Sequence, residues 1–136
     1  MDTLNFESIW LGQCICKYQV PLDVYQMINS IYEKNFDKLP PANKQLVGKI
    51  KNEHSLYYQG KDLSKMHNHN LLPFHVLRWL KGAILHYLKY TKTQEYTLNI
   101  NSIWVNQMKA NEYNPIHVHQ GSLYTGLSSV MILKLP

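Results

Sequence analysis

The feature that most constrains the fold is a change in the hydrophobic pattern near residue 96. From there apolar and polar residues alternate, which is the period of a β-strand. Within this region stands the triplet His117-Val118-His119. Alternate side chains of a strand point to one face, so both imidazoles would point the same way, with Cα atoms about 6.5 Å apart. Two imidazole nitrogens at that spacing can share one metal ion at about 2 Å each. The C-terminal third therefore predicts a β-scaffold that presents two histidines.

A longer pattern surrounds these histidines. Trp104 and Asn106 come first as Trp-x-Asn, a polar turn covers residues 109–115, and an apolar strand is predicted over residues 127–135 after His117-x-His119. This pattern resembles the 2-oxoglutarate- and Fe(II)-dependent oxygenases. More narrowly, it is similar to the prolyl 4-hydroxylase-like branch with a His-x-His motif that marine bacteria and their tailed phages carry. The similarity is specific over residues 104–136 and only general before them.

The resemblance implies a fold, a set of cofactors and a reaction. The fold is α+β, with helices packed against a double-stranded β-helix, which is a jelly-roll or cupin-like core. The cofactors are Fe(II) and 2-oxoglutarate, with ascorbate as reductant, and the reaction is hydroxylation of a protein or peptide substrate, with proline as a candidate target. His117 and His119 would bind the metal. Asn106, Tyr113 and Tyr124 are candidates for contact with the cosubstrate or the substrate.

The sequence departs from that family at two points. A carboxylate normally completes an iron site of two histidines. In this sequence the last acidic residue is Glu112, and His119 stands where the family has an Asp or Glu. No histidine or arginine follows, and Lys134 is the sole basic residue beyond the motif. We therefore expect a β-core that is incomplete at its C-terminus and inactive as a dioxygenase by itself. The apolar edge between Leu127 and Leu135 is expected to pair with a completing C-terminal polypeptide or with a second copy.

The length of 136 residues fits one domain over residues 1–136. Residues 1–95 would form a helical and mixed support region, and residues 96–136 the start of the β-core. Apolar residues at helical spacing predict helices over residues 22–36 and 74–90. Further strands are predicted over residues 9–20, 53–58, 96–106 and 116–119. A polar surface loop is expected over residues 59–70, where His67 and His69 form a second His-x-His that we read as exposed.

The formal net charge of +5 leaves a second class of function open. The alternative is a non-catalytic β-sandwich binding protein, such as a phage structural or accessory protein, with a basic surface for nucleic acid. However, Arg78 is the sole arginine, and arginine is the residue that reads guanine and phosphate with two hydrogen bonds. The spread lysines therefore favour a solvated surface over nucleic-acid binding.

Neither the cysteines nor the hydropathy indicates an exported or membrane protein. Cys14 and Cys16 would share one face of a strand at a spacing too short for a useful disulfide, so we expect reduced thiols. No apolar run approaches the roughly 20 residues of a membrane helix, and the N-terminus lacks the basic start of a signal peptide. We expect a cytoplasmic protein, in the bacterial host cytoplasm if the gene is viral.

Overall fold

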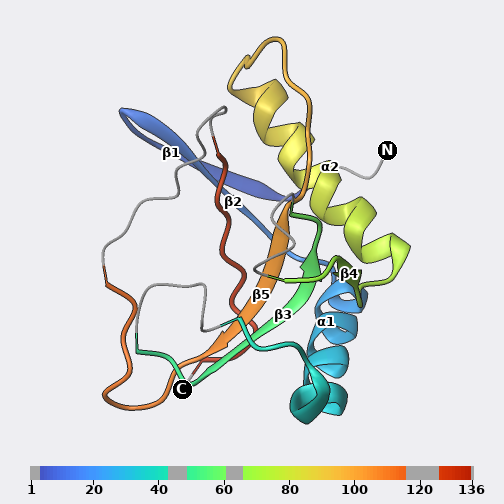
Figure 1. Ribbon diagram of the computed structural model, residues 1–136. Helices are drawn as coiled ribbons and strands as arrows, with labels where there is room; N and C mark the ends of the chain where they lie inside the picture. Colours follow the sequence, from blue (N-terminus) through green and yellow to red (C-terminus); the bar gives the residue numbers. More distant parts are fainter. Residues whose placement is uncertain (1–3, 43–48, 61–65, 116–125, 136) are drawn as a thin grey trace.

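The computed structural model describes residues 4–42, 49–60, 66–115 and 126–135 (Figure 1). In these ranges the chain forms an α+β structure with two α-helices and two antiparallel sheets. One sheet is the hairpin β1-β2, and the other has the strand order β4-β3-β5. The α+β class is therefore confirmed. The strands of the described residues form these two separate sheets and close no barrel.

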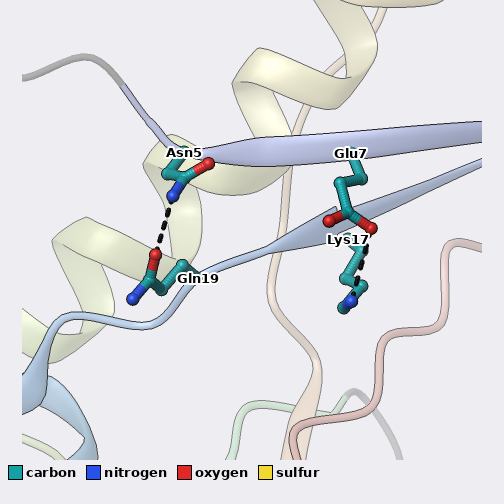
Figure 2. Close-up of polar contacts among 4 residues, drawn as sticks. All are labelled: Asn5, Glu7, Lys17 and Gln19. Carbon is teal, nitrogen blue, oxygen red and sulfur yellow. Dashed lines mark hydrogen bonds and ion pairs between the residues drawn. The ribbon is translucent and has the colours of Figure 1, made fainter.

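The N-terminal hairpin corrects the single strand predicted over residues 9–20. Strand β1 (Phe6–Leu11) turns back at Gly12 into β2 (Gln13–Tyr18). Gly12 has φ of 82°, a left-handed conformation that glycine adopts without a steric penalty. At the base of the hairpin the Asn5 amide donates a hydrogen bond to Gln19 Oε1 at 2.7 Å (Figure 2). Lys17 and Glu7 form an exposed ion pair nearby at 3.3 Å, a kind of pair that stabilises little.

Helix α1 (Leu22–Asn35) confirms the first predicted helix. Pro21 stands just before it and Asp23 occupies the first turn, where a negative charge is favourable. The buried side chains are Val24, Ile28 and Tyr32. The 3-10 helix η1 (Phe36–Lys38) follows.

Helix α2 (Phe74–Tyr90) has the predicted bounds. It buries Val76, Ala83 and Leu88, and Leu77 and Leu80 are half-buried against the core. Among the described residues, neither helix combines the length and the apolar character that crossing a membrane requires.

The three-stranded sheet is centred on β3 (Asn52–Tyr58), which confirms the strand predicted over residues 53–58. Its antiparallel neighbours are the short β4 (His69–Asn70) and β5 (Ser102–Gln107). Two predictions are wrong here. Residues 96–101 are not part of a strand, and the segment read as a polar loop contains β4. A register shift between Ser55 and Tyr57 adds a residue to β3, as in a β-bulge.

The core lies between this sheet and the two helices (Figure 1). Leu56 of β3 and Val76 of α2 are fully buried in it, together with the apolar face of α1. Ile103 and Val105 of β5 pack on the same cluster. One face of the β3–β5 pair is therefore covered by helices.

Residues 126–135, drawn in red in Figure 1, do not form the predicted strand. They are nonetheless tied to the core. Met131 and Leu133 pack against the core cluster, whereas Val130 is 90% exposed. The hydroxyl of Tyr25 in α1 donates a hydrogen bond to the Leu133 carbonyl at 2.9 Å. The predicted strand over residues 116–119 lies outside the described residues.

Candidate functional site

The structure describes two of the five predicted site residues. Asn106 is exposed on β5, directly opposite Glu53 of β3. Tyr113 is exposed and pairs across an isolated bridge with Lys49, whose backbone N–H donates to the Tyr113 carbonyl at 3.0 Å. Both therefore lie toward the end of the sheet where β3 begins. His117, His119 and Tyr124 lie outside the described residues.

The β3–β5 pair has two chemically different faces. His54, whose ring centroid lies 4.7 Å from that of Phe36, pairs with Val105 on the face that packs on the helices. Side chains alternate along a strand, so Glu53 and its partner Asn106 point to the opposite face. That face carries polar groups, and Asn106 is one of the predicted site residues.

Glu53 is the most unusual group on the polar face. Its side chain is only 3% exposed, and its Oε1 atom has no hydrogen-bond partner in the described part of the chain. Burial raises the pKa of Glu53, and the negative charge of Glu112 raises it further. A buried carboxyl with an unpartnered oxygen is costly, because each buried polar atom without a partner loses its hydration. Glu53 is therefore a candidate for binding a cation or donor.

Glu112 plays a different part in the same region. Its Oε2 accepts the Lys109 backbone N–H at 2.8 Å, and its Oε1 accepts that of Lys51 at 3.2 Å. The hydrogen bond from Lys109 is the main reason that the pKa of Glu112 is lowered. Glu112 thus links the segment after β5 to the start of β3 with both oxygens engaged. Glu53 is the carboxyl of the two that retains an unpartnered oxygen.

A serine–histidine contact lies further along β3. His69 Nδ1 is 2.9 Å from the His67 carbonyl, which can only accept, so Nδ1 carries the proton. The Ser55 hydroxyl lies 2.9 Å from Nε2 and 3.4 Å from the Tyr57 carbonyl, to which it can donate. The distances suit a nucleophile and its base, but Ser55 is buried at 3% exposure and out of reach of a substrate. We interpret this contact as a structural link between β3 and β4.

A second polar cluster joins the hairpin to α2. Cys14, Cys16 and Tyr18 occupy alternate positions of β2, and the Tyr18 hydroxyl lies 3.0 Å from His86 Nδ1. The two Sγ atoms are 3.7 Å apart. Burial raises the pKa of Tyr18 to about 12, with Cys16 adding to the effect. His86 of α2 is thus held by a tyrosine of the hairpin.

A cavity of about 420 Å³ opens near the start of α1. Its lining includes Asn5, Gln19 and Tyr25, with Ile132 from the C-terminal segment. Neither Asn106 nor Tyr113, the two predicted site residues that the structure describes, lines this cavity.

Sequence reasoning missed Glu53 as a candidate group. A signal for Glu53 was present, because Glu53 and Ser55 are polar at alternate positions of a predicted strand. Their burial could not be foreseen, since it depends on segments distant in the sequence.

Over the ranges that the structure describes, no three His, Cys, Asp or Glu side chains gather closely enough to hold a metal ion. Comparisons with protein-family models, curated proteins and solved structures found no match to this chain. Any function assigned to it therefore rests on its own residues.

Proposed function

We propose that this chain forms part of a non-haem Fe(II)- and 2-oxoglutarate-dependent dioxygenase that hydroxylates a protein or peptide side chain, with proline as the first candidate target. The observation that carries the proposal is the pattern Trp104-x-Asn106 followed by His117-x-His119. The first half of this pattern lies on β5, which is an edge strand of the three-stranded sheet. One face of that sheet packs on the helices.

The two-faced sheet supports this proposal. In the family that the pattern resembles, helices cover the outside of a double-stranded β-helix and the metal lies inside it. Here the helices cover the face of Val105 and His54, and the opposite face carries Asn106. We propose that this polar face is the inner surface of such a β-core. Asn106, with Tyr113 and Tyr124, would bind the polar groups of the cosubstrate or substrate.

The donor set suits Fe(II) better once Glu53 is considered. His117 and His119 supply imidazoles, and iron sites of this class also need a carboxylate. Glu53 is a carboxyl on the same face as Asn106, with an oxygen that has no partner among the described residues. We propose Glu53 as that carboxylate. Fe(II), when bound, would supply the oxidative chemistry with 2-oxoglutarate, O₂ and ascorbate as reductant, while the protein orients the substrate and excludes water.

We also propose a polypeptide partner for residues 126–135. Val130 is 90% exposed, Leu135 is 71% exposed and Ile132 is 67% exposed on a segment whose Met131 and Leu133 face the core. Exposed apolar side chains beside backbone that pairs with no described strand are a site for β-pairing with another segment. An extended apolar segment of another polypeptide is the proposed occupant, and a second copy of this chain is the other outcome.

The metal proposal can be tested by anaerobic titration with Fe(II), and with Co(II) as a spectroscopic substitute. We expect the His117→Ala/His119→Ala double variant to bind at least about tenfold more weakly than the wild type. Glu53→Gln should weaken binding similarly if it is a ligand. His67→Ala removes an exposed histidine outside the pattern and serves as the matched control. Equal affinity of the double variant and the wild type would overturn the iron site. An effect at the histidines without one at Glu53 would overturn only the role of Glu53.

A further inference from the structure

One face of the N-terminal hairpin is open to solvent. The other face is turned toward α2, where the Tyr18 hydroxyl lies 3.0 Å from His86 Nδ1 and the Ser8 hydroxyl lies 3.0 Å from that of Tyr90. Because side chains alternate along a strand, the residues between these positions point away from α2. They form three cross-strand pairs, which we call the open face: Glu7–Lys17, Ile9–Ile15 and Leu11–Gln13.

The open face is apolar toward the tip of the hairpin. Ile9 is 55% exposed, Leu11 is 76% exposed and Ile15 is 54% exposed. Single exposed aliphatic residues are common on protein surfaces, but three adjacent ones form a contiguous patch, which is typical of an interaction surface. A two-stranded hairpin is also marginally stable by itself, so cover on its second face would stabilise it.

The charges at the base of the open face indicate which partner covers it. Glu7 of β1 and Lys17 of β2 stand side by side there, with Lys17 Nζ 3.3 Å from Glu7 Oε2 (Figure 2). The open face therefore carries a negative charge on β1 and a positive charge on β2. A second hairpin that faces the first, with its tip pointing the same way, places its β2 against β1 and its β1 against β2. Each Glu7 then lies opposite the Lys17 of the other copy.

We propose that the open face binds a second copy of this chain, in a two-fold dimer of hairpins packed face to face. A two-fold interface uses the same patch on both copies, so the patch has to be complementary to itself. With both tips pointing the same way, two Glu7–Lys17 pairs form between the copies, and each Ile9 covers an Ile15. With the tips in opposite directions, each charge would face Leu11 or Gln13 and lose hydration without gaining an opposite charge.

The size of the open face sets the strength of the contact. Three residue pairs from each copy give an interface at the small end of the range for specific contacts, where association is typically weak. Exposed charge pairs add little affinity, but like charges placed opposite each other suppress a wrong pairing. We therefore expect a reversible, concentration-dependent dimer in which the isoleucines supply the affinity and the charges fix the orientation.

The test uses two charge reversals, Glu7→Lys and Lys17→Glu, in analytical ultracentrifugation of the full chain at low ionic strength. Each reversal places like charges opposite each other at both charge contacts of the dimer, so each variant alone should dimerise at least about tenfold more weakly than the wild type. In an equal mixture of the two variants, the two lysines of one chain face the two glutamates of the other, so a heterodimer should form. Recovery in the mixture cannot arise from chains that fail to fold.

The apolar part of the contact has its own pair of variants. Ile15→Thr keeps a β-branched side chain and removes apolar surface, and it should weaken the dimer at least about tenfold. Val130→Thr is the matched control, because it makes the same kind of change at an exposed aliphatic residue outside the hairpin. This control should dimerise as the wild type does. Circular dichroism of each variant establishes that the chain remains folded.

A wild type that stays monomeric up to about 1 mM would overturn the proposal. A mixture of the two reversals that stays monomeric while the wild type dimerises would contradict it, as would an Ile15→Thr variant that dimerises like the wild type. Loss of the dimer in Val130→Thr would place the contact on residues 126–135 instead. Binding of a monomeric wild type to phosphatidylcholine vesicles, lost in Ile15→Thr, would assign the open face to a membrane and refute the dimer. The His117→Ala/His119→Ala variant should retain the dimer, so the hairpin contact and the proposed iron site are tested separately.

Discussion

The Tyr25 hydroxyl of α1 donates a hydrogen bond to the Leu133 carbonyl at 2.9 Å, and this bond joins residues that are 108 positions apart in the chain. Leu133 also packs against the core cluster next to Met131. One hydrogen bond and two apolar side chains therefore connect residues 126–135 to the helical layer, although this segment pairs with no described strand.

Removal of this hydroxyl should loosen the C-terminal segment. We expect Tyr25→Phe to lower the free energy of unfolding by about 1 kcal/mol, the typical net contribution of one hydrogen bond. Urea unfolding followed by circular dichroism measures the change. Tyr96→Phe is the control, because Tyr96 is exposed and has no described hydrogen bond. Equal effects of the two substitutions would show that the Tyr25 contact is not a stabilising one.

The two glycines at positions 12 and 82 should respond to alanine in opposite directions. Gly12 has φ of 82°, where a Cβ is strained, so Gly12→Ala should destabilise the chain by about 1–2 kcal/mol. Gly82 lies inside α2 and a Cβ there meets nothing within 4 Å. Gly82→Ala should therefore stabilise by roughly 0.5–1 kcal/mol through helix propensity. Thermal unfolding of both variants tests the pair, and a stabilising Gly12→Ala would contradict the hairpin turn.

The helices could be predicted because their signals are local. Apolar spacing predicted both helices, and α2 has the predicted bounds. The strands depend on distant partners, so their prediction was less accurate. Alternation continues across Gly12, and only its backbone conformation reveals that the chain reverses there.

The same reason explains what was missed in the candidate site. Alternation alone could not distinguish residues 96–101, which join no strand, from β5, which pairs with β3. Burial of Glu53 depends on β5 and on the chain near Ala42, whose backbone N–H donates to the Glu53 carbonyl at 2.8 Å. Asn106 could be placed on a strand, but not in its position opposite Glu53. The roles of His117, His119 and Tyr124 remain predictions.

Glu53 and Glu112 should give opposite pH dependences of stability. Burial raises the pKa of Glu53 above its ordinary value of 4.5, so the folded state holds this proton more tightly than the unfolded state. The stability that Glu53 contributes is therefore fully present below pH 4.5 and is lost as the pH rises through its folded pKa. Glutamine has the shape of the protonated, uncharged glutamate side chain, so Glu53→Gln should remove the loss of stability that accompanies ionisation. In the metal-free protein we therefore expect this substitution to stabilise the chain near neutral pH.

Glu112 is the matched comparison, because its pKa is lowered, chiefly by the hydrogen bond from the Lys109 backbone. Its contribution is present above its ordinary pKa of 4.5 and is lost as the pH falls through the lowered folded value. Glu112→Gln should thus destabilise the chain near neutral pH and weaken the link between Lys109 and Lys51. Urea unfolding of both variants from about pH 2 to pH 8, with metal removed, measures the two slopes across the range where carboxyls titrate. If Glu53→Gln destabilised the metal-free chain at neutral pH as Glu112→Gln does, the Glu53 carboxylate would have a stabilising partner, and its unpartnered oxygen could not be the reason to expect a cation there.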